Sequence, residues 1–433
     1  MNAPALRDYM AAHGHAAADW PVKQWGLTEL TLLAFYYHPE LTVARAQANA
    51  ALAEAGLAGQ GGPIKVTPLI QHHSKRVDGN DSPWSLGFDV EIPIASGTRR
   101  AVIAERAGYL AESAELNVGS VAWQVRSQVR SHLLDLYAAR STASSLTTEV
   151  QARNTLVALI ERRLEAGSVS ATELSAARIK LSEARGRLAA ATTSEQQASG
   201  QLAAAVGVAP EVLRGQKLSF SEFATVPDAP QGAQAQREAL TNRLDLRRAL
   251  LDYAAADAAV KLAVAKQYPD VTLRPGYLWD QGYGVWSVAV DLLFPAGSVP
   301  GIRAAEAQRE VAARQAIGHQ ASIITGVQTA LAAYEQAAAG AQAATQTGLI
   351  QIARNVQMQK QFDAGYADRF EVTQSNLEAA GIERNALAAQ IETQRVLGQL
   401  EDALQRPLSG GPLPAFATGY DMADPAAQAS AAR

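Results

Sequence analysis

The sequence contains no cysteine, and it is poor in aromatic and charged residues. The lack of cysteine excludes disulfides, zinc-thiolate centres and thiol nucleophiles. Aromatic residues make up 6% of the chain and charged residues 18%. Alanine, glutamine, glutamate and arginine fill the long segments instead. This composition is typical of long helices rather than of a compact α/β enzyme.

A strong net charge and long apolar runs are missing as well. The formal net charge is −4 at pH 7, which gives no electrostatic footprint for nucleic acid. No run of about 18 apolar residues occurs, so we expect no transmembrane helix. Residues 1–19 lack the apolar core of a signal peptide. Taken alone, this indicates the cytoplasm, although a processed chain would look the same.

Sequence motifs of catalysis are also missing. The chain has no GxSxG, HExxH or phosphate-loop sequence. His72 and His73 are adjacent on a predicted strand, so their side chains point to opposite faces and do not share a metal ion. We therefore expect no enzyme, no cofactor and no metal site.

An internal repeat dominates what the chain does contain. Residues 162–206 align without a gap with residues 360–404. The matches include an Ala-Gly pair, a glutamate that follows it and a Gln-Leu pair near the end of both segments. A repeat of this extent predicts two units of about 200 residues with the same architecture.

Each predicted unit runs strand, strand, long helix and return helix, with a glycine between the two helices. Repeat 1 covers residues 25–206, with strands at about 65–76 and 84–94, a long helix at about 99–166 and a return helix at 171–206. Repeat 2 covers residues 237–404, with strands at about 271–279 and 285–294, a long helix at about 301–364 and a return helix at 367–404. An N-terminal extension (1–24), an equatorial linker (207–236) and a C-terminal tail (405–433) complete the chain.

The predicted strands alternate apolar and polar side chains. In residues 84–94 the face of Trp84 and Phe88 is apolar, and the face of Ser85 and Asp89 is polar. Such alternation is typical of a soluble antiparallel sheet and also of a membrane β-barrel. Four strands cannot close a barrel, and open edges in lipid leave backbone groups unsatisfied. In a membrane we therefore expect three copies to pool about 12 strands, because the eight strands of two copies leave no channel.

Four motifs follow one another in a fixed order along the chain. They are HPELTVARAQANAALAEA (38–55), SLGFDVEIPIASGTRRAVIAERA (85–107), RRLEAGSVSATELSAAR (162–178) and KQFDAGYADRFEVTQSNLEAA (360–380). In this order, and duplicated, they resemble the TolC-like outer-membrane efflux protein family over residues 25–406. The stretches WGLTELTLLAFYYHPEL and AWQVRSQVRSHLLDLYAAR are most similar to the branch associated with heavy-metal and related cation efflux.

This resemblance implies a mainly α protein with a small β part. It implies a homotrimer whose long antiparallel rods form an α-barrel, capped by a transmembrane β-barrel of about 12 strands. Such a duct lies in the outer membrane of a Gram-negative bacterium, in contact with its lipid, and most of the chain is in the periplasm. Its partners are a periplasmic adaptor (membrane fusion protein) and an inner-membrane transporter. The duct conducts metal cations or small toxic compounds passively and catalyses no reaction.

The resemblance also implies where the functional residues lie. The adaptor-docking turns are Gly167, Ser168 and Val169 in repeat 1, and Gly365, Tyr366 and Ala367 in repeat 2. The periplasmic aperture or gate is formed by Thr172, Glu173, Asp363, Asp368, Arg369 and Glu371. A ring of carboxylates from symmetry-related chains favours cations at such a constriction.

Some positions depart from the family pattern, and two acidic residues belong to the barrel. The gating tyrosine of the family is Phe362 here, its gating arginine is Ala367, and a second aperture acid is Gln374. The latch therefore differs in composition from that of the family. Asp89 and Asp291 occupy equivalent strand positions and are expected to face the barrel lumen.

Two alternative functions stay open on the sequence alone. The exit duct of a type I protein secretion system has the same architecture and would carry the same motifs. A soluble coiled-coil scaffold would fit the long helices and the missing signal sequence. Detergent-dependent solubility and a stable trimer favour the duct, whereas a water-soluble monomer favours the scaffold.

Overall fold

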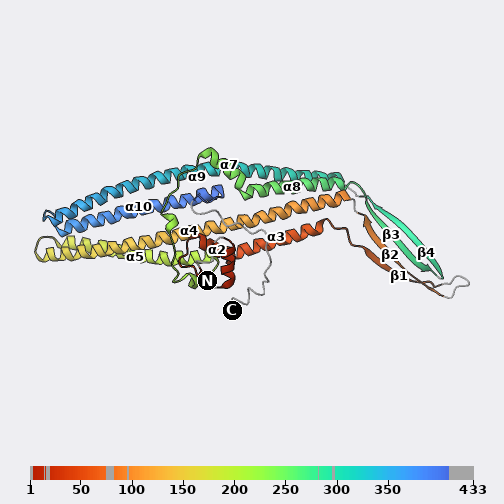
Figure 1. The fold of residues 1–433 in the computed structure, drawn as a ribbon, viewed down its shortest axis with the longest axis horizontal. Coiled ribbons are helices and arrows are strands. Elements are labelled where there is room, and N and C mark those ends of the chain that lie inside the picture. Colours follow the sequence, from red (N-terminus) through yellow and green to blue (C-terminus); the bar gives the residue numbers. More distant parts are fainter. Residues whose placement is uncertain are drawn as a thin grey trace. The chain divides into compact units, whose positions relative to one another are not determined.

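The computed structural model describes residues 3–13, 15, 20–74, 82–94, 97–280, 282–294 and 298–408. Within these residues the protein is mainly helical and has one four-stranded antiparallel sheet (Figure 1), which confirms the predicted fold class at this level. None of the described helices has a stretch that is long and apolar enough to cross a membrane. The predicted strand ends at residues 75 and 76 and the C-terminal tail from residue 409 onward lie outside the described residues.

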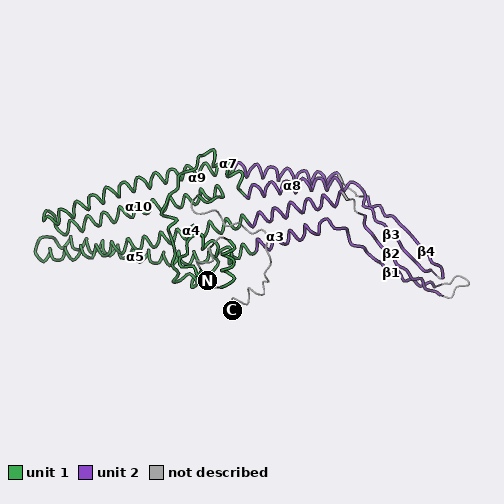
Figure 2. The backbone as a smooth tube through the Cα atoms, viewed as in Figure 1, with its two compact units in different colours: residues 1–42, 119–243, 322–433 green, residues 43–118, 244–321 purple. Residues whose placement is uncertain are grey.

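The chain divides into two compact units, shown in different colours in Figure 2. Unit 1 consists of Met1–Thr42, Gly119–Arg243 and Ser322–Arg433. Unit 2 consists of Val43–Val118 and Leu244–Ala321. Helices α3, α4 and α9 each contribute residues to both units.

The longest elements follow one another in the same order twice. The first series is α3 (Pro39–Ala58), β1 (Lys65–His72), β2 (Trp84–Ile94), α4 (Gly97–Glu165) and α5 (Ala171–Val206). The second is α8 (Leu244–Ala265), β3 (Asp270–Asp280), β4 (Tyr283–Leu293), α9 (Ser298–Asp363) and α10 (Arg369–Leu404). Helices α4 and α9 are 69 and 66 residues long, and α5 and α10 both have 36 residues.

Unit 1 contains two antiparallel helical hairpins, α4 with α5 and α9 with α10 (Figure 1). Side chains bridge the helices of each hairpin. The Arg178 guanidinium donates to Glu161 at 2.8 Å in the first hairpin, and Arg354 donates to Glu378 at 3.1 Å in the second. Helix α4 contains no proline, and the proline of α9 lies in its first turn, where its missing N–H costs no helical hydrogen bond.

The first hairpin has its own apolar core near the turn. It consists of Val157, Ile160, Leu174, Ala177 and Leu181. These residues recur at three- and four-residue spacing, so they lie on the facing sides of α4 and α5. Burying a valine, leucine or isoleucine side chain contributes about 1.5–3 kcal/mol. A helix as long as α4 needs such packing, because helix propensity alone does not stabilise it.

The remaining elements of unit 1 are short. They are α1 (Pro4–Ala12), α2 (Leu27–Tyr37), α6 (Pro210–Leu213), a 3-10 turn (Ser221–Phe223) and α7 (Gly232–Asn242). Helix α1 packs on α2 and buries Leu6 and Met10 completely. Backbone hydrogen bonds between Trp25 and the linker, from Trp25 N to Lys217 O at 2.8 Å and from Ser219 N to Trp25 O at 2.9 Å, tie the linker to the start of α2.

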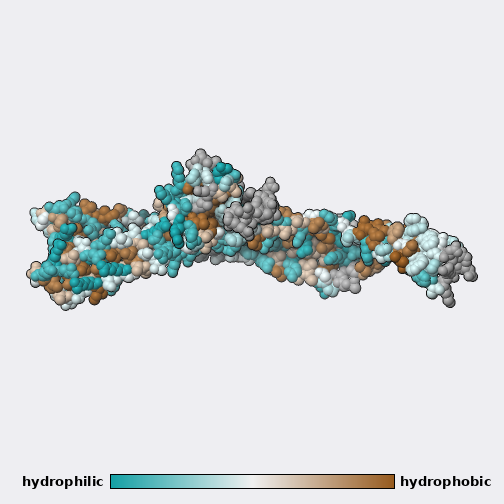
Figure 3. All heavy atoms as spheres, turned by 90° about the horizontal axis from the view of Figure 1, so that it is seen from below, coloured by the Kyte–Doolittle hydropathy of each residue, from teal (hydrophilic) through white to brown (hydrophobic). Residues whose placement is uncertain are grey.

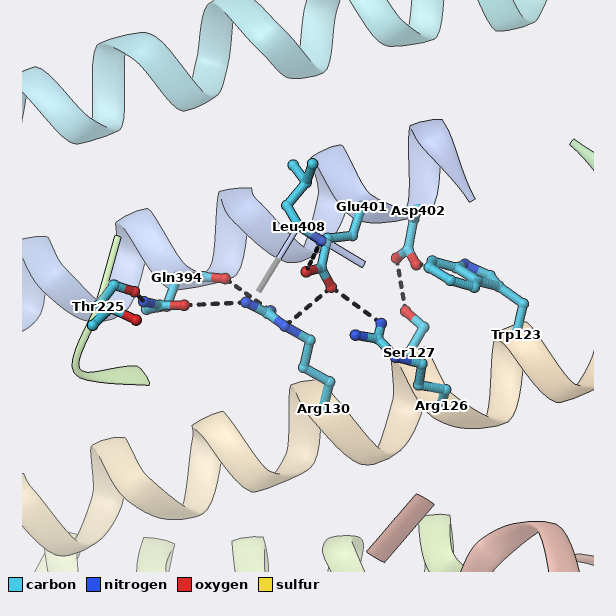
Figure 4. Close-up of polar contacts among 9 residues, drawn as sticks. All are labelled: Trp123, Arg126, Ser127, Arg130, Thr225, Gln394, Glu401, Asp402 and Leu408. Atoms are coloured by element: carbon cyan, nitrogen blue, oxygen red, sulfur yellow. Dashed lines mark hydrogen bonds and ion pairs between the residues drawn. The ribbon is translucent and has the colours of Figure 1, made fainter. Parts of the chain in front are cut away.

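A buried polar network joins α4 to α10 in unit 1 (Figure 4). Glu401 forms ion pairs with Arg126 at 3.1 Å and with Arg130 at 3.4 Å, and its side chain is 1% exposed. The neighbouring Asp402 accepts hydrogen bonds from Trp123 and Ser127 at 2.9 and 2.7 Å. Burial lowers the pKa of Arg130 and raises the pKa of Asp402, because a charged group loses hydration in such a site.

The same network holds the linker. Arg130 donates to the backbone and side-chain oxygens of Gln394 at 2.9 and 3.1 Å. The Gln394 amide in turn donates to Thr225 O at 2.7 Å (Figure 4). The linker backbone therefore has fixed partners on α10, as buried carbonyl groups require.

The sheet of unit 2 has the strand order β1-β2-β3-β4, with all neighbours antiparallel. Its register keeps like side chains together, since Phe88 lies opposite Tyr277, and Tyr277 lies opposite Trp286. The resulting apolar face is open to the surroundings. Trp286 is 80% exposed and Val288 is 73% exposed.

Candidate functional site

Both long helices end in the same backbone motif at the hairpin turns. Gly167 and Gly365 have φ angles of 70° and 78°, in the left-handed region. The next amide reaches back across the turn, from Ser168 to Arg163 O and from Tyr366 to Gln361 O, both at 2.8 Å. This is the Schellman arrangement, in which glycine avoids the clash of a Cβ with the backbone. The sequence-level match of the two glycines thus has a conformational reason.

The return helices begin with side-chain caps that include the two predicted aperture glutamates. Ser170 accepts a hydrogen bond from Glu173 N at 3.2 Å and caps α5. Asp368 accepts one from Glu371 N at 2.9 Å, and Glu371 Oε2 accepts one from Asp368 N at 2.9 Å. The second pair forms a complete capping box. The Glu371 carboxylate is therefore bound to the backbone of its N-cap, whereas the Glu173 carboxylate accepts a hydrogen bond from the Ser170 hydroxyl at 3.3 Å. Both residues are exposed.

The other predicted turn residues form an exposed surface around these caps. Thr172 and Arg369 are exposed, and Asp363 is exposed and accepts a hydrogen bond from Gln359 at 2.9 Å. Of the predicted docking residues, Gly167, Ser168, Gly365 and Tyr366 are exposed, whereas Val169 and Ala367 are half-buried. Tyr366 reaches 87% exposure, so the second turn presents a large aromatic side chain to its surroundings.

A cluster of three residues joins the two hairpins beside these turns. Arg163 near the end of α4 forms an ion pair with Asp368, the N-cap of α10. The Arg163 guanidinium also lies 4.7 Å from the centre of the Phe370 ring. Phe370 packs against the apolar core of the first hairpin. We call Arg163, Asp368 and Phe370 the tip clamp.

The tip clamp depends on the charge of Asp368. The backbone hydrogen bond from Glu371, together with the nearby Arg163, holds the pKa of Asp368 below its usual value. The Arg163 and Asp368 side chains are 37% and 51% exposed. An ion pair this exposed is worth about 0–1 kcal/mol, and the cation–π contact with Phe370 adds roughly 0.5–1 kcal/mol. Because both contributions are small, little free energy is needed to break these two contacts.

A second junction lies further from the turns and is centred on a buried carboxylate. Glu149 of α4 binds Arg153 of its own helix at 2.6 Å, Arg187 of α5 at 2.8 Å and Arg384 of α10 at 2.7 Å. The Glu149 side chain is 2% exposed. Burial alone would raise the pKa of Glu149, but the three arginines outweigh it and hold the pKa below its ordinary value. We call these four residues the Glu149 hub.

The sequence predicts Asp368 as an aperture residue, but it does not identify its partner Arg163 or the Glu149 hub as functional. One signal for the hub was available, because Glu149 follows Leu146 by three residues and so places a charge on the apolar seam. A carboxylate in such a position needs a cationic partner from a neighbouring helix. For Arg163 no signal of this kind was available, since its partner Asp368 lies in the second hairpin.

The surface of the second hairpin carries exposed apolar side chains. Leu349, Ile350, Ile352 and Val356 of α9 are all more than half exposed. On the face that Figure 3 shows, hydrophobic and hydrophilic side chains also alternate along the hairpin end of unit 1. Isolated apolar residues on a surface are ordinary, but a group on one helix is typical of a face that contacts another molecule.

In unit 2, the register places Asp89 and Asp291 on the polar face of the sheet. Asp89 lies opposite Gly276, and Gly276 lies opposite Ser287. Ser287 and Asp291 are separated by an even number of positions on β4, so they lie on the same face as Asp89. Asp291 forms an ion pair with Arg274 at 2.6 Å. The face opposite to these groups is the exposed apolar one, so the acidic side chains of the described strands and large exposed apolar ones such as Trp286 lie on opposite faces of the sheet.

The fold of this chain, with long helical hairpins and a small antiparallel sheet, is similar to that of solved outer-membrane channels. VceC from Vibrio cholerae has this fold, with a TM-score of 0.71 and 18% identity over 87% of this chain and 95% of its own. The open state of the MtrE outer membrane channel from Neisseria gonorrhoeae has a TM-score of 0.69 and 17% sequence identity, over 87% of this chain and 88% of its own. CusC has a TM-score of 0.71 and 16% sequence identity, over 87% of this chain and 91% of its own.

A family model matches part of the sequence. Residues 33–208 match the family model described as outer membrane efflux protein, which confirms the resemblance to the TolC-like outer-membrane efflux proteins. No curated protein matches the sequence. The family consists of transport ducts and not of enzymes, so the predicted class, a duct without catalytic activity, is confirmed.

Proposed function

We propose that three copies of this chain form the outer-membrane exit duct of a tripartite efflux pump in a Gram-negative bacterium. In this duct the sheets of three chains close one β-barrel of about 12 strands, and the helical hairpins form a periplasmic α-barrel. Conduction is passive. Its partners are a periplasmic adaptor and an inner-membrane transporter, and its substrates are metal cations or small toxic compounds.

The observation that carries this proposal is the sheet of unit 2. Strands β2, β3 and β4 have 11 residues each and β1 has 8. At about 3.4 Å per residue and a tilt near 45°, the three strands of 11 residues span the apolar band of about 25 Å of an outer membrane. The exposed face with Trp286 and Val288 suits lipid, since aromatic and aliphatic side chains cover the outside of such barrels.

The edges of the sheet support the trimer. Strands β1 and β4 are the outer strands of the described sheet, and every residue of β4 is exposed. Unpaired strand edges are unstable in lipid, and closure with neighbouring copies satisfies their backbone groups. The exposed apolar residues of α9 fit contact between neighbouring helical hairpins.

The hairpin turns fit a periplasmic aperture. In this proposal Thr172, Glu173, Asp363, Asp368, Arg369 and Glu371 line the aperture, and the turns at Gly167, Ser168, Val169, Gly365, Tyr366 and Ala367 dock the adaptor. The tip clamp between Arg163 and Asp368 holds the hairpins together in the resting duct. Its small free energy suits an aperture that opens when an adaptor binds.

The oligomeric state and the membrane association test this proposal together. The full chain is expressed with a bacterial secretion signal, membranes are fractionated, and the protein is extracted in detergent. We expect it in the outer-membrane fraction, and we expect native mass spectrometry to give three copies per particle. A monomer that stays in solution without detergent would contradict the duct and favour the coiled-coil scaffold.

A further inference from the structure

The two equivalent aspartates of the sheet differ in their surroundings. Asp291 on β4 is bound by Arg274 of β3, whose guanidinium lies 2.6 Å from its carboxylate. Asp89 on β2 has no ion pair or hydrogen bond among the residues that the structure describes. Equivalent positions in the two halves of the chain therefore carry different effective charge.

The other acidic side chains of the strands also have partners. Glu91 pairs with Lys65 at 3.8 Å, Asp270 pairs with Arg99, and Asp280 contacts His73 at 3.2 Å and the hydroxyl of Ser85. All of them lie on the polar face, as the register requires. Asp89 is thus the carboxylate of the described strands that no neighbour neutralises.

The neighbours of Asp89 fix where its carboxylate lies. A Cβ built on Gly276 would collide with the carboxylate oxygen of Asp89, and it would lie 2.7 Å from the hydroxyl of Ser287. The Asp89 side chain therefore extends across β3 over the space that the glycine leaves free. A glycine inside a strand weakens the strand and is typical of a place where another group approaches closely.

We infer that Asp89 is the charge-selecting residue of the β-barrel, and that Asp291 contributes little to selectivity. This inference rests on the proposed function, because it requires the polar face to line a conducting lumen. Three symmetry-related copies of Asp89 then form a ring of unpaired carboxylates, which raises the local concentration of cations and repels anions. An aspartate paired to arginine at 2.6 Å adds no net charge at the distance of a passing ion.

The experiment compares isosteric and charge-conserving variants in planar bilayers under a salt gradient. Asp89→Asn keeps the shape of the side chain and removes the charge, whereas Asp89→Glu keeps the charge. The double variant Asp291→Asn with Arg274→Gln removes the ion pair without changing the net charge. The reversal potential gives the permeability ratio of cation to anion for each channel.

We expect Asp89→Asn to move the reversal potential toward that of a non-selective pore, and Asp89→Glu to keep the wild-type value. The double variant is expected to keep the wild-type ratio. A conducting Asp89→Asn channel with unchanged selectivity would overturn the inference and leave the duct intact, as would an equal shift in the double variant. A wild-type protein that conducts no ions would overturn the proposed function and this inference with it.

Discussion

Arg163 and Asp368 lie 205 positions apart in the chain and form an ion pair between the two helical hairpins of unit 1. Asp368 serves two purposes at once, because it also caps the N-terminus of α10. Arg163 lies over the ring of Phe370 as well. The junction of the hairpins is therefore connected to the start of α10, and a change at one affects the other.

Removing the charge of Asp368 while keeping its cap separates these two roles. Asparagine is as good an N-cap as aspartate, whereas alanine costs about 1 kcal/mol of helix stability. We expect Asp368→Asn to release Arg163 and to raise the fraction of time that single channels are open, without lowering the melting temperature. Asp368→Ala should open the channel and also lower the melting temperature.

Arg163→Lys is the matched test from the other side of the ion pair. Lysine keeps the positive charge but lacks the planar group that stacks on an aromatic ring. We expect its open fraction to lie between those of the wild type and of Arg163→Gln. Equal opening in Arg163→Lys and the wild type would show that the contact with Phe370 is not part of the clamp.

The tip clamp is expected to respond to acid. Because the pKa of Asp368 is lower in the folded protein than in the unfolded chain, its stabilising effect is fully present above the unfolded value, about 3.9. It is lost as the pH falls through the lower folded value. Channel opening should therefore not change through Asp368 between about pH 5 and 8, and it should rise in more acidic solution. An acid response of the same size in Asp368→Asn would contradict this assignment.

The predicted aperture glutamates are tested by replacements that keep the capping geometry. Glutamine preserves the contact of the third helical residue with the N-cap, so Glu371→Gln and Glu173→Gln remove charge but keep the helix starts. If both carboxylates line the aperture, we expect higher conductance or a weaker preference for cations in the double variant. Unchanged conductance and selectivity would leave them with the capping role alone.

The Glu149 hub is expected to govern stability. Removing the buried carboxylate leaves Arg153, Arg187 and Arg384 without their ionic partner. The loss of one partner of a fully buried ion pair costs about 3–5 kcal/mol, and water that reaches these partly exposed arginines makes the expected cost smaller. We expect Glu149→Gln to lower the thermal unfolding midpoint clearly. The control is Glu161→Gln, since Glu161 forms an exposed pair with Arg178, and such pairs contribute about 0–1 kcal/mol. Similar midpoints for the two variants would contradict the hub.

The sequence predicts the fold class because its signals are local. Unbroken helical periodicity and strict alternation in the strands indicate a mainly helical chain with a small antiparallel sheet, and this is confirmed. The residue types at the turns also follow local rules, since Gly167 and Gly365 end their helices with positive φ. The predicted roles of the turn residues in docking and gating stay predictions.

The junctions between elements were beyond sequence reasoning because they depend on register over long separations. Neither the pairing of Arg163 with Asp368 nor that of Glu149 with Arg384 follows from any spacing along one helix. The different environments of Asp89 and Asp291 have the same origin. Arg274 lies on β3, and only the pairing of β3 with β4 brings it to Asp291.

Single-channel recording of the full-length protein in a planar bilayer shows whether the chain forms a duct and whether the tip clamp keeps it closed. The wild type and Asp368→Asn are compared at the same voltage, pH and ionic strength. We expect discrete ion conductance from trimers, with openings that are rare in the wild type and frequent in Asp368→Asn. A complete lack of conductance in both proteins would contradict the duct, and identical open fractions would contradict the tip clamp as its gate.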